Sequence, residues 1–310
     1  MANSVPRSDN AASSAGFARA IAWGEVRKGG AAPLRVIRRA PLIPSAIILA
    51  FIAAALLANL LSPADPYEQT LRARFTPPVW EDGGSSKHLL GTDRLGRDML
   101  SRILFGARVS LAAAMLAVLL AGFIGASVGL VAGYYRGRVD AILMRITDAT
   151  LSFPVILLAL ILAVTVGPSF QNVVIAIAVI LWARYARVIR GQVLTLMELD
   201  FIAQARIAGC SPWRIITRHL FPNTLNTLIV LLTLQVGYVI IVEAGLSFLG
   251  AGIPAPTPAW GSMIAEGRDF ITSAWWVSFF PGLAILLVVL AFNLFGDWLR
   301  DVLDPKLRQL

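Results

Sequence analysis

Apolar residues fall in six long runs along the chain, separated by polar segments. The runs cover approximately residues 43–61, 109–134, 141–166, 172–191, 224–250 and 277–297. None alternates apolar and polar residues as a half-buried strand does. Because a helix rises about 1.5 Å per residue, roughly 20 apolar residues cross the hydrocarbon core of a membrane. The pattern therefore predicts an all-α polytopic membrane protein with six transmembrane helices, and it argues against a β-barrel.

The overall composition supports a membrane protein embedded in lipid. Of 310 residues, 57% are hydrophobic and only 15% are charged, too few polar residues to cover a water-soluble globule. The first apolar run follows a polar, arginine-bearing stretch of about 42 residues. We therefore interpret it as a retained span and not as a cleaved signal peptide. We expect residues 1–30, which are rich in Ala, Ser and Gly, to lack a packed core.

Basic residues predict which loops lie in the cytoplasm. Most of the 27 Lys and Arg residues fall in segments 1–42, 135–145, 184–218 and 300–308. Positively charged loops stay inside, so both termini are predicted to be cytoplasmic. The predicted organisation is a cytoplasmic N-terminal segment 1–42, a first span 43–61, an external segment 62–106, a transmembrane domain 107–300 with a cytoplasmic hairpin 198–222, and a cytoplasmic tail 301–310. The net charge of +9 then needs no nucleic-acid partner.

Residues for catalysis or metal binding are scarce. His88 and His219 lie on opposite sides of the membrane in this topology, and Cys210 is the only cysteine. The chain has no G-x-x-x-x-G-K-[ST] phosphate loop and no G-x-S-x-G or H-E-x-x-H motif. We expect no catalytic residue, no metal site and no cofactor in this chain.

Two acidic residues lie inside apolar runs, where a carboxylate is costly. We expect Asp148 to form a structural ion pair with Arg145, three residues earlier, while a role in a transport pathway or gate stays open. Glu243 has no basic residue nearby in the sequence. It either lines a pathway or bonds to a neighbouring helix. Gly125, Gly129 and Gly133 share one helix face, which favours close packing, within this subunit more than between subunits.

The stretch "DFIAQARIAGCSPWRIITRHLFPN", residues 200–223, is predicted to be a helical hairpin. A helix from about Phe201 to Ala208 would end at Gly209. Ser211 can cap a second helix with Pro212 at its first position. That helix, to about Leu220, separates an apolar from a basic face and is expected to lie flat at the membrane surface; the faces are Trp213, Ile216 and Leu220 against Arg214 and Arg218.

This hairpin resembles the EAA loop of type I ABC importer permeases. Ala205, Gly209 and Pro222 match that pattern, whereas Ala203 replaces its glutamate and Gln204 replaces an alanine. Three further stretches are similar to the second, C-type subunit of the dipeptide/oligopeptide/nickel class of these permeases: "HLLGTDRLGRDMLSRILFGARVSL" (88–111), "EAGLSFLGAGIPAPTPAWG" (243–261) and "FFPGLAILLVVLAFNLFGDWLRDVLDP" (279–305). The resemblance covers residues 33–308.

The resemblance implies a subunit of a bacterial inner-membrane importer. Its partners would be a second homologous permease, two P-loop ATPase subunits carrying ATP and Mg²⁺, an external substrate-binding protein and membrane lipid. The ATPase-coupling residues would be Ala203, Gln204, Ala205, Arg206, Gly209, Pro212 and Pro222. We expect binding-protein docking at Gly91, Thr92, Asp93, Gly96, Arg97, Asp98, Pro256, Pro258 and Trp260.

The cargo implied by the resemblance is a dipeptide or oligopeptide, with nickel complexes, glutathione or oligosaccharides as alternatives. A proton-coupled secondary transporter is a more distant alternative, because the spans do not pair into internal repeats. A membrane-anchored DNA-binding regulator would carry its helix-turn-helix at a terminus, and here the hairpin lies between two spans.

Overall fold

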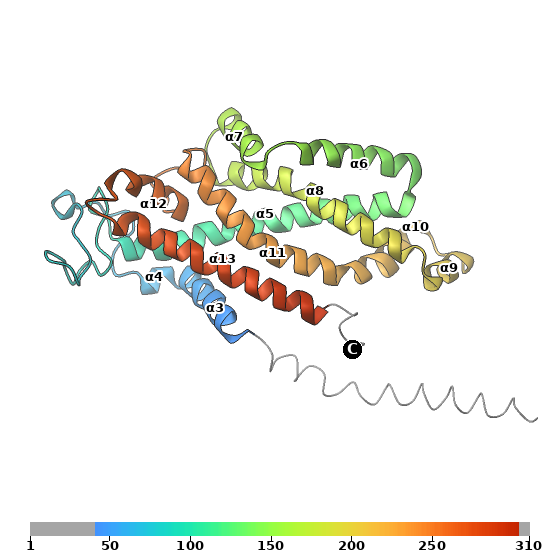
Figure 1. Ribbon diagram of the computed structural model, residues 1–310, viewed down its shortest axis with the longest axis horizontal. Coiled ribbons are helices and arrows are strands. Elements are labelled where there is room, and N and C mark those ends of the chain that lie inside the picture. Colours follow the sequence, from blue (N-terminus) through green and yellow to red (C-terminus); the bar gives the residue numbers. More distant parts are fainter. Residues whose placement is uncertain (1–40, 304–310) are drawn as a thin grey trace, which may run out of the picture. The chain divides into compact units, whose positions relative to one another are not determined.

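The computed structural model describes residues 41–303, and within them the regular structure is entirely helical (Figure 1). Predictions for residues 1–40 and 304–310 lie outside the described residues. The long elements are α3 (Leu42–Leu56), α5 (Met99–Tyr135), α6 (Gly137–Ser152), α7 (Val155–Val166), α8 (Phe170–Leu196), α11 (Phe221–Phe248) and α13 (Trp276–Leu303). The short ones are α4 (Ala58–Leu61), η1 (Leu71–Ala73), α9 (Asp200–Ile207), α10 (Pro212–Arg214), η2 (Ile215–Leu220), α12 (Trp260–Gly267) and η3 (Arg268–Phe270).

Four of the six predicted spans are long, apolar helices in the described part of the chain. They are Met99–Tyr135, Phe170–Leu196, Pro212–Phe248 and Trp276–Leu303. The first predicted span is instead divided into α3 and α4 at Leu57, so that α3 alone is shorter than a membrane crossing. The third predicted span is also divided.

The third span differs from a straight helix because of Pro154. Helices α6 and α7 meet there at an angle of 88°. Proline disfavours helical backbone at the residue before it, and Phe153 is extended, with ψ of 137°. The hydropathy pattern ran across this point without interruption, because Phe, Pro and Val are all compatible with an apolar run. The two parts also differ in character: α6 carries Arg138, Asp140, Arg145 and Asp148, whereas α7 has no charged residue.

Helices α5 and α8 make the most extensive contact in the bundle, through the predicted glycine face. A Cβ atom added at Gly129 would lie 2.7 Å from the Ala186 carbonyl oxygen of α8, and one at Gly133 would lie 2.6 Å from the Val193 side chain. Gly125 likewise faces the backbone of α8. The prediction of close packing within this subunit is confirmed, since no larger residue fits at these three positions.

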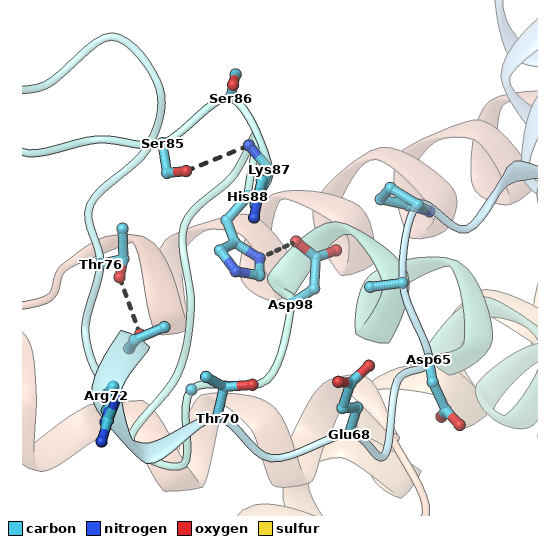
Figure 2. A pocket seen from close by; sticks show the side chains of 14 residues that line it. Asp65, Glu68, Thr70, Arg72, Thr76, Ser85, Ser86, Lys87, His88 and Asp98 are labelled. Carbon is cyan, nitrogen blue, oxygen red and sulfur yellow. Dashed lines mark hydrogen bonds and ion pairs between the residues drawn. The ribbon is translucent and has the colours of Figure 1, made fainter.

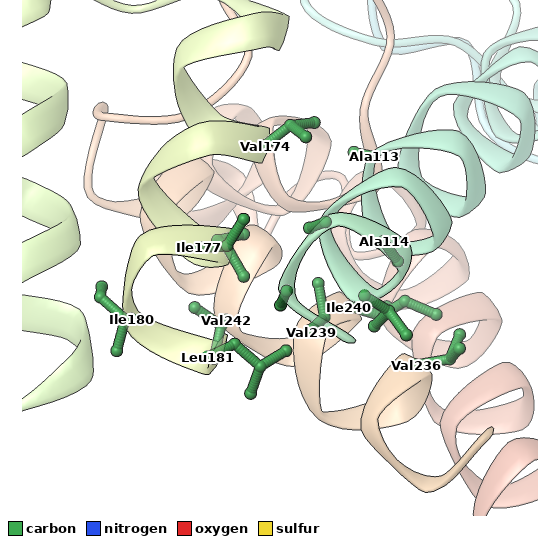
Figure 3. Packing of buried hydrophobic residues seen from close by; sticks show 14 of the residues in the cluster. Ala113, Ala114, Val174, Ile177, Ile180, Leu181, Val236, Val239, Ile240 and Val242 are labelled. Atoms are coloured by element: carbon green, nitrogen blue, oxygen red, sulfur yellow. The ribbon is translucent and has the colours of Figure 1, made fainter. Parts of the chain in front are cut away.

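Helix α11 closes the core against α5 and α8. Ala113 and Ala114 of α5 meet Ile177 and Leu181 of α8 and Ile240 of α11, all buried (Figure 3). Helix α13 packs along α11 and α3, and α12 packs on α11 and α13. Within this bundle α12 and the segment before α5 lie at one end, and α9 lies at the other (Figure 1).

Candidate functional site

The turn of the hairpin 198–222 is built by a glycine cap. Gly209 has φ of +73°, its N–H bonds to the Arg206 carbonyl at 3.0 Å, and the Cys210 N–H bonds to the Ala205 carbonyl at 3.0 Å. These two bonds form a Schellman motif, which satisfies the last carbonyls of α9. A Cβ at Gly209 would meet nothing within 4 Å. Glycine is therefore needed for its left-handed backbone and not for space, as the sequence predicted.

The second half of the hairpin begins as predicted. The Ser211 hydroxyl accepts a bond from the Arg214 N–H at 3.4 Å, and Pro212 is the first helical residue. The helix does not end at Leu220, however. It passes through the π-helical turn η2 into α11, so that Pro212–Phe248 is one helical segment of 37 residues. The prediction of a separate helix that ends near Leu220 is wrong, and its position at the membrane surface stays a prediction.

Pro222 explains this difference, because it lies within the helix and not at its end. Proline has no N–H, and its ring crowds the carbonyl four residues earlier. The turn before it is widened, and the Phe221 N–H bonds to the Ile216 carbonyl, five residues back. Such a π turn lets the chain accommodate the proline without breaking the helix.

Most of the predicted coupling residues are exposed at this end of the bundle. Ala205 is buried, and the exposed ones are Ala203, Gln204, Arg206, Gly209, Pro212 and Pro222. Two large apolar residues beside the turn were not among the predicted coupling residues: Ile207 is 88% exposed, and Trp213, which was predicted to face the membrane surface, is 74% exposed. The sequence signal was available, since bulky apolar residues on either side of a capped turn have no core to enter.

Two of the predicted docking residues of the external segment, Asp93 and Arg97, belong to an internal charge cluster with Arg102, which was not predicted to dock. Asp93, Arg97 and Arg102 are almost fully buried, and the Arg97 Nε donates to Asp93 at 2.6 Å. Arg97 and Arg102 also bind Glu266 of α12, at 2.7 and 3.0 Å, and Arg102 binds Asp93. Burial alone would raise the pKa of Asp93, but the charges of Arg102 and Arg97 and the N–H bonds from Arg97 and Leu95 hold it below its ordinary value.

Asp98 has a separate structural task at the start of α5. It caps the helix by accepting from the Ser101 N–H at 2.8 Å, and its other oxygen lies 3.0 Å from His88 Nδ1. The pair forms one wall of a cavity of about 720 Å³ that Asp65 and Glu68 also line (Figure 2).

The remaining predicted docking residues are mostly buried, and one is exposed. Gly91, Thr92 and Gly96 are buried, as are Pro258 and Trp260, whereas Pro256 is exposed. Trp260 packs against Gly106 and donates from its ring to the Ile103 carbonyl of α5 at 3.1 Å. A docking role for this end stays a prediction, and the buried members would act by shaping the surface and not by touching a partner.

The partner of Asp148 was predicted incorrectly. Asp148 pairs with Arg187 of α8, and no ion pair joins it to Arg145 in the described residues. Helix α6 packs along α8 and makes a second ion pair with it, between Asp140 and Arg190. Both carboxylates therefore meet cations across the helix interface, while Arg145, Arg187 and Asp148 are all exposed.

Glu243 is completely buried and bonds to a neighbouring helix. It accepts from Ser110 of α5 at 3.3 Å and from Ser247 at 2.8 Å. Those hydroxyls in turn accept from the Trp260 and Ile253 N–H groups, each at 3.4 Å. Of the two open interpretations, the helix contact is present, and it ties both ends of the loop before α12 to α5 and α11. A pathway role for Glu243 stays a prediction.

Three arginines were assigned to a cytoplasmic loop that the structure places in a helix. Arg184, Arg187 and Arg190 lie within α8, which continues to Leu196. The assignment followed from ending the fourth span at residue 191 and counting its basic end as loop. Because an arginine inside a predicted span is unusual, Arg184 was a signal that these residues belong to a helix and not to the loop after it.

Comparison with known proteins identifies the class of molecule. Residues 125–309 match the family described as "Binding-protein-dependent transport system inner membrane component". The chain belongs to this family and is a multi-pass protein of the bacterial inner membrane. It is a permease component and not an enzyme, since ATP hydrolysis in such importers is carried out by separate ATPase subunits.

Individual relatives narrow the class to type I ABC importer permeases. A putative peptide transport system permease of Brucella suis is 45% identical over 271 residues, covering 87% of this chain and 89% of the relative. The dipeptide transport system permease of Escherichia coli is 47% identical over 263 residues (85% and 87%). A glutathione transport system permease of Pectobacterium atrosepticum is 45% identical over 261 residues (84% and 85%).

A solved structure supports the fold. The MetNI methionine ABC transporter in an inward-facing conformation aligns with a TM-score of 0.54 at 20% identity, covering 66% of this chain and 97% of the matched chain.

Proposed function

We propose that this chain is the C-type permease subunit of an ATP-driven importer that takes up dipeptides or oligopeptides through a passage shared with a second permease. The observation that carries the proposal is the 45–47% identity to peptide and dipeptide permeases over most of both chains. Two P-loop ATPases, which bind ATP and Mg²⁺, and an external substrate-binding protein would complete the importer.

In this proposal the hairpin 198–222 couples the ATPases to the membrane helices. It offers what a docking element needs: a capped, rigid turn, small residues at Ala203 and Ala208, and two exposed apolar anchors, Ile207 and Trp213. Large exposed aromatic residues are the usual centres of binding energy at protein interfaces. Arg206, also exposed, would reach acidic groups on the ATPase.

We further propose six membrane crossings with both termini in the cytoplasm. Helices α3 and α4 would form the first crossing, and the bent pair α6 and α7 the third. Support comes from the lipid-like surface of α3, where Leu42 is 77% and Ile43 is 75% exposed. The bend in the third crossing requires protein or water around it, because unpaired backbone groups are not tolerated in lipid.

Labelling of Cys210, the only thiol, tests this topology. A membrane-impermeant maleimide should leave it unmodified in intact cells and react in inside-out vesicles, more so after the ATPases are stripped. Efficient labelling in intact cells would place the hairpin outside the cell and contradict the proposed topology.

Reconstitution tests the function as a whole. The chain should co-purify with two P-loop ATPases and a second permease, and calorimetry on the substrate-binding protein of the same importer should detect binding of short peptides. Nickel chelates and oligosaccharides serve as comparison ligands. A complex that assembles but ignores peptides would preserve the importer assignment and remove the cargo.

Glutathione is the second candidate, favoured by the glutathione permease at 45% identity. Its γ-glutamyl linkage separates it from ordinary peptides, so uptake of glutathione without uptake of α-linked tripeptides would select it. For nickel no feature of residues 41–303 gives support, since they contain no group of three possible metal ligands.

A further inference from the structure

Arg184 carries a positive charge near the middle of a long membrane helix. It lies about 21 Å along the α8 axis from Phe170 and about 18 Å from Leu196, at about 1.5 Å per residue. Its side chain is exposed, and its guanidinium carbon lies 4.7 Å from the centre of the Tyr238 ring of α11. In the part of the chain that the structure describes, no carboxylate pairs with it. A charge inside a membrane helix usually marks a functional site.

The neighbouring arginines of α8 differ from Arg184 in this respect. One turn further on, Arg187 is paired with Asp148, and Arg190 binds Asp140 through its Nε at 3.0 Å. Both of those carboxylates come from α6. In the described part of the chain, Arg184 therefore contacts only the Tyr238 ring in this way, and its N–H donors are free to bind an anion.

Two cavities adjoin this arginine between α8 and α11. The first, about 390 Å³, is lined by Arg184, Arg187 and Gln235 among others. The second, about 460 Å³, shares Val188 and Leu231 with the first and adds three amides and a further cation: Gln192, Asn223, Asn226 and Arg300. Each wall holds a buried polar atom that has no hydrogen-bond partner among residues 41–303, the Tyr185 hydroxyl and the Gln192 Oε1. The two cavities adjoin at Val188 and Leu231, and we call them together the trough. Its lining is mixed, with apolar side chains beside the charged and amide groups.

Other exposed faces of the bundle have the opposite character. Phe123 of α5 is 75% exposed and Leu286 of α13 is 60% exposed, among many apolar neighbours. Those faces suit lipid. The trough does not, because an arginine in contact with hydrocarbon is strongly disfavoured. Water or a polar partner must cover it.

We propose that Arg184 binds the C-terminal carboxylate of the peptide cargo as it passes along the trough. The inference rests on the proposed function, because it assumes that the cargo is a peptide. A guanidinium binds a carboxylate through two parallel hydrogen bonds. The amides of Gln235 and Asn226 match the donors and acceptors of a peptide backbone, and the open volume leaves room for a solute. A carboxylate from the second permease would instead fill that volume.

Thiol accessibility distinguishes these two sources of the carboxylate. Arg184→Cys in a Cys210→Ser background, assembled with its partners in vesicles, should react with an anionic methanethiosulfonate reagent, and transported peptide should slow the reaction. The matched control is Phe123→Cys on the lipid face, which should stay unreactive. An Arg184→Cys thiol as inert as the Phe123→Cys control would show that protein or lipid covers the trough, and the inference would be overturned.

Transport kinetics supply the second measurement. With saturating binding protein, Arg184→Gln should lower the maximal uptake of a free dipeptide at least about tenfold, as expected for loss of one charged hydrogen bond. Arg184→Lys should recover part of the rate, and Tyr238→Phe, which keeps the ring, should retain it. If the Arg184→Gln variant took up dipeptide as fast as the wild type, the role of Arg184 would be refuted and the proposed function would stand. A wild-type complex that imports another cargo but no peptide would refute the proposed function.

Discussion

The hairpin 198–222 and the external segment 62–106 were both predicted to be contact surfaces, and they are built in opposite ways. The hairpin leaves Ile207 and Trp213 largely exposed and holds its shape through backbone bonds around Gly209. The external segment buries Asp93, Arg97 and Arg102 and holds its shape through ion pairs that reach Glu266. The hairpin thus leaves apolar surface exposed for a partner, whereas the external segment pairs its charges with one another.

The difference distinguishes residues that can bind a partner from residues that stabilise the fold. A buried ion pair is weak evidence of net stability, yet removing one member leaves an uncompensated charge and is strongly destabilising. An exposed apolar residue costs the isolated fold little and becomes valuable when a partner covers it. Substitutions at the two ends should therefore affect different properties.

The largest expected effect is on folding, at Asp93. Asp93→Asn leaves Arg97 and Arg102 facing Glu266 alone and should destabilise the permease by about 3–5 kcal/mol. Thermal unfolding of the purified protein in detergent measures it. The control is Asp269→Asn, whose pair with Arg268 is mostly exposed and should be worth at most about 1 kcal/mol. Equal shifts in the two variants would remove the distinction between the ends.

The next effect is on coupling, at Gly209. Gly209→Val forces a β-branched residue into φ of +73° and should cost about 1–3 kcal/mol of local strain. Binding-protein-stimulated ATP hydrolysis and transport should fall while the complex still assembles. Gly209→Asn, which tolerates this backbone, should keep most of the activity. Normal transport by Gly209→Val at normal expression would contradict the coupling assignment.

A smaller effect is expected at the apolar anchors. Ile207→Ala and Trp213→Ala should leave stability within about 0.5 kcal/mol of wild type, because both side chains are largely exposed. Each should weaken association with the ATPases by about 1 kcal/mol or more. Binding of detergent-solubilised permease to purified ATPase measures this, with Leu286→Ala on α13 as an exposed apolar control that should bind normally.

The smallest effect concerns pH. The folded pKa of Asp93 is depressed, so its contribution to stability is complete above the ordinary value of 3.8 and is lost only as the pH falls through the lowered pKa. Unfolding midpoints should therefore not change on this account between pH 7 and pH 5, and Asp93→Asn should be equally destabilising at both. A wild-type advantage over Asp93→Asn that disappears at pH 5 would show that Asp93 is already protonated there.

Local patterns predicted the elements of this protein better than its long-range pairings. The turn at Gly209 followed from glycine before Ser-Pro, and the α5 glycine face followed from a spacing of four. The break at Pro154 was missed because hydropathy does not register that proline disfavours helical backbone at the residue before it. Asp148 was given Arg145 since sequence shows only near neighbours, and its actual partner Arg187 comes from another helix.

The burial of the external motif was also beyond the sequence. A stretch such as "GTDRLGRDM" is typical of a solvated surface, and only the distant Glu266 completes the internal cluster that Arg97 and Asp93 form with Arg102. Ile207 and Trp213 were not predicted to be coupling residues, although their place beside a capped turn was a signal for exposure. Their environment depends on partners that are not encoded in this chain.

The uninterrupted segment Pro212–Phe248 gives the protein a stiff lever. At about 1.5 Å per residue its 37 residues extend about 55 Å, from the hairpin past Glu243 to Phe248, where the loop anchored through Ser247 begins. A tilt of about 5° at the hairpin would displace the far end by about 5 Å. In the proposed topology, force applied to the hairpin would thus reach the loop before α12 through this helix, and the π turn before Pro222 is a place where the helix can bend.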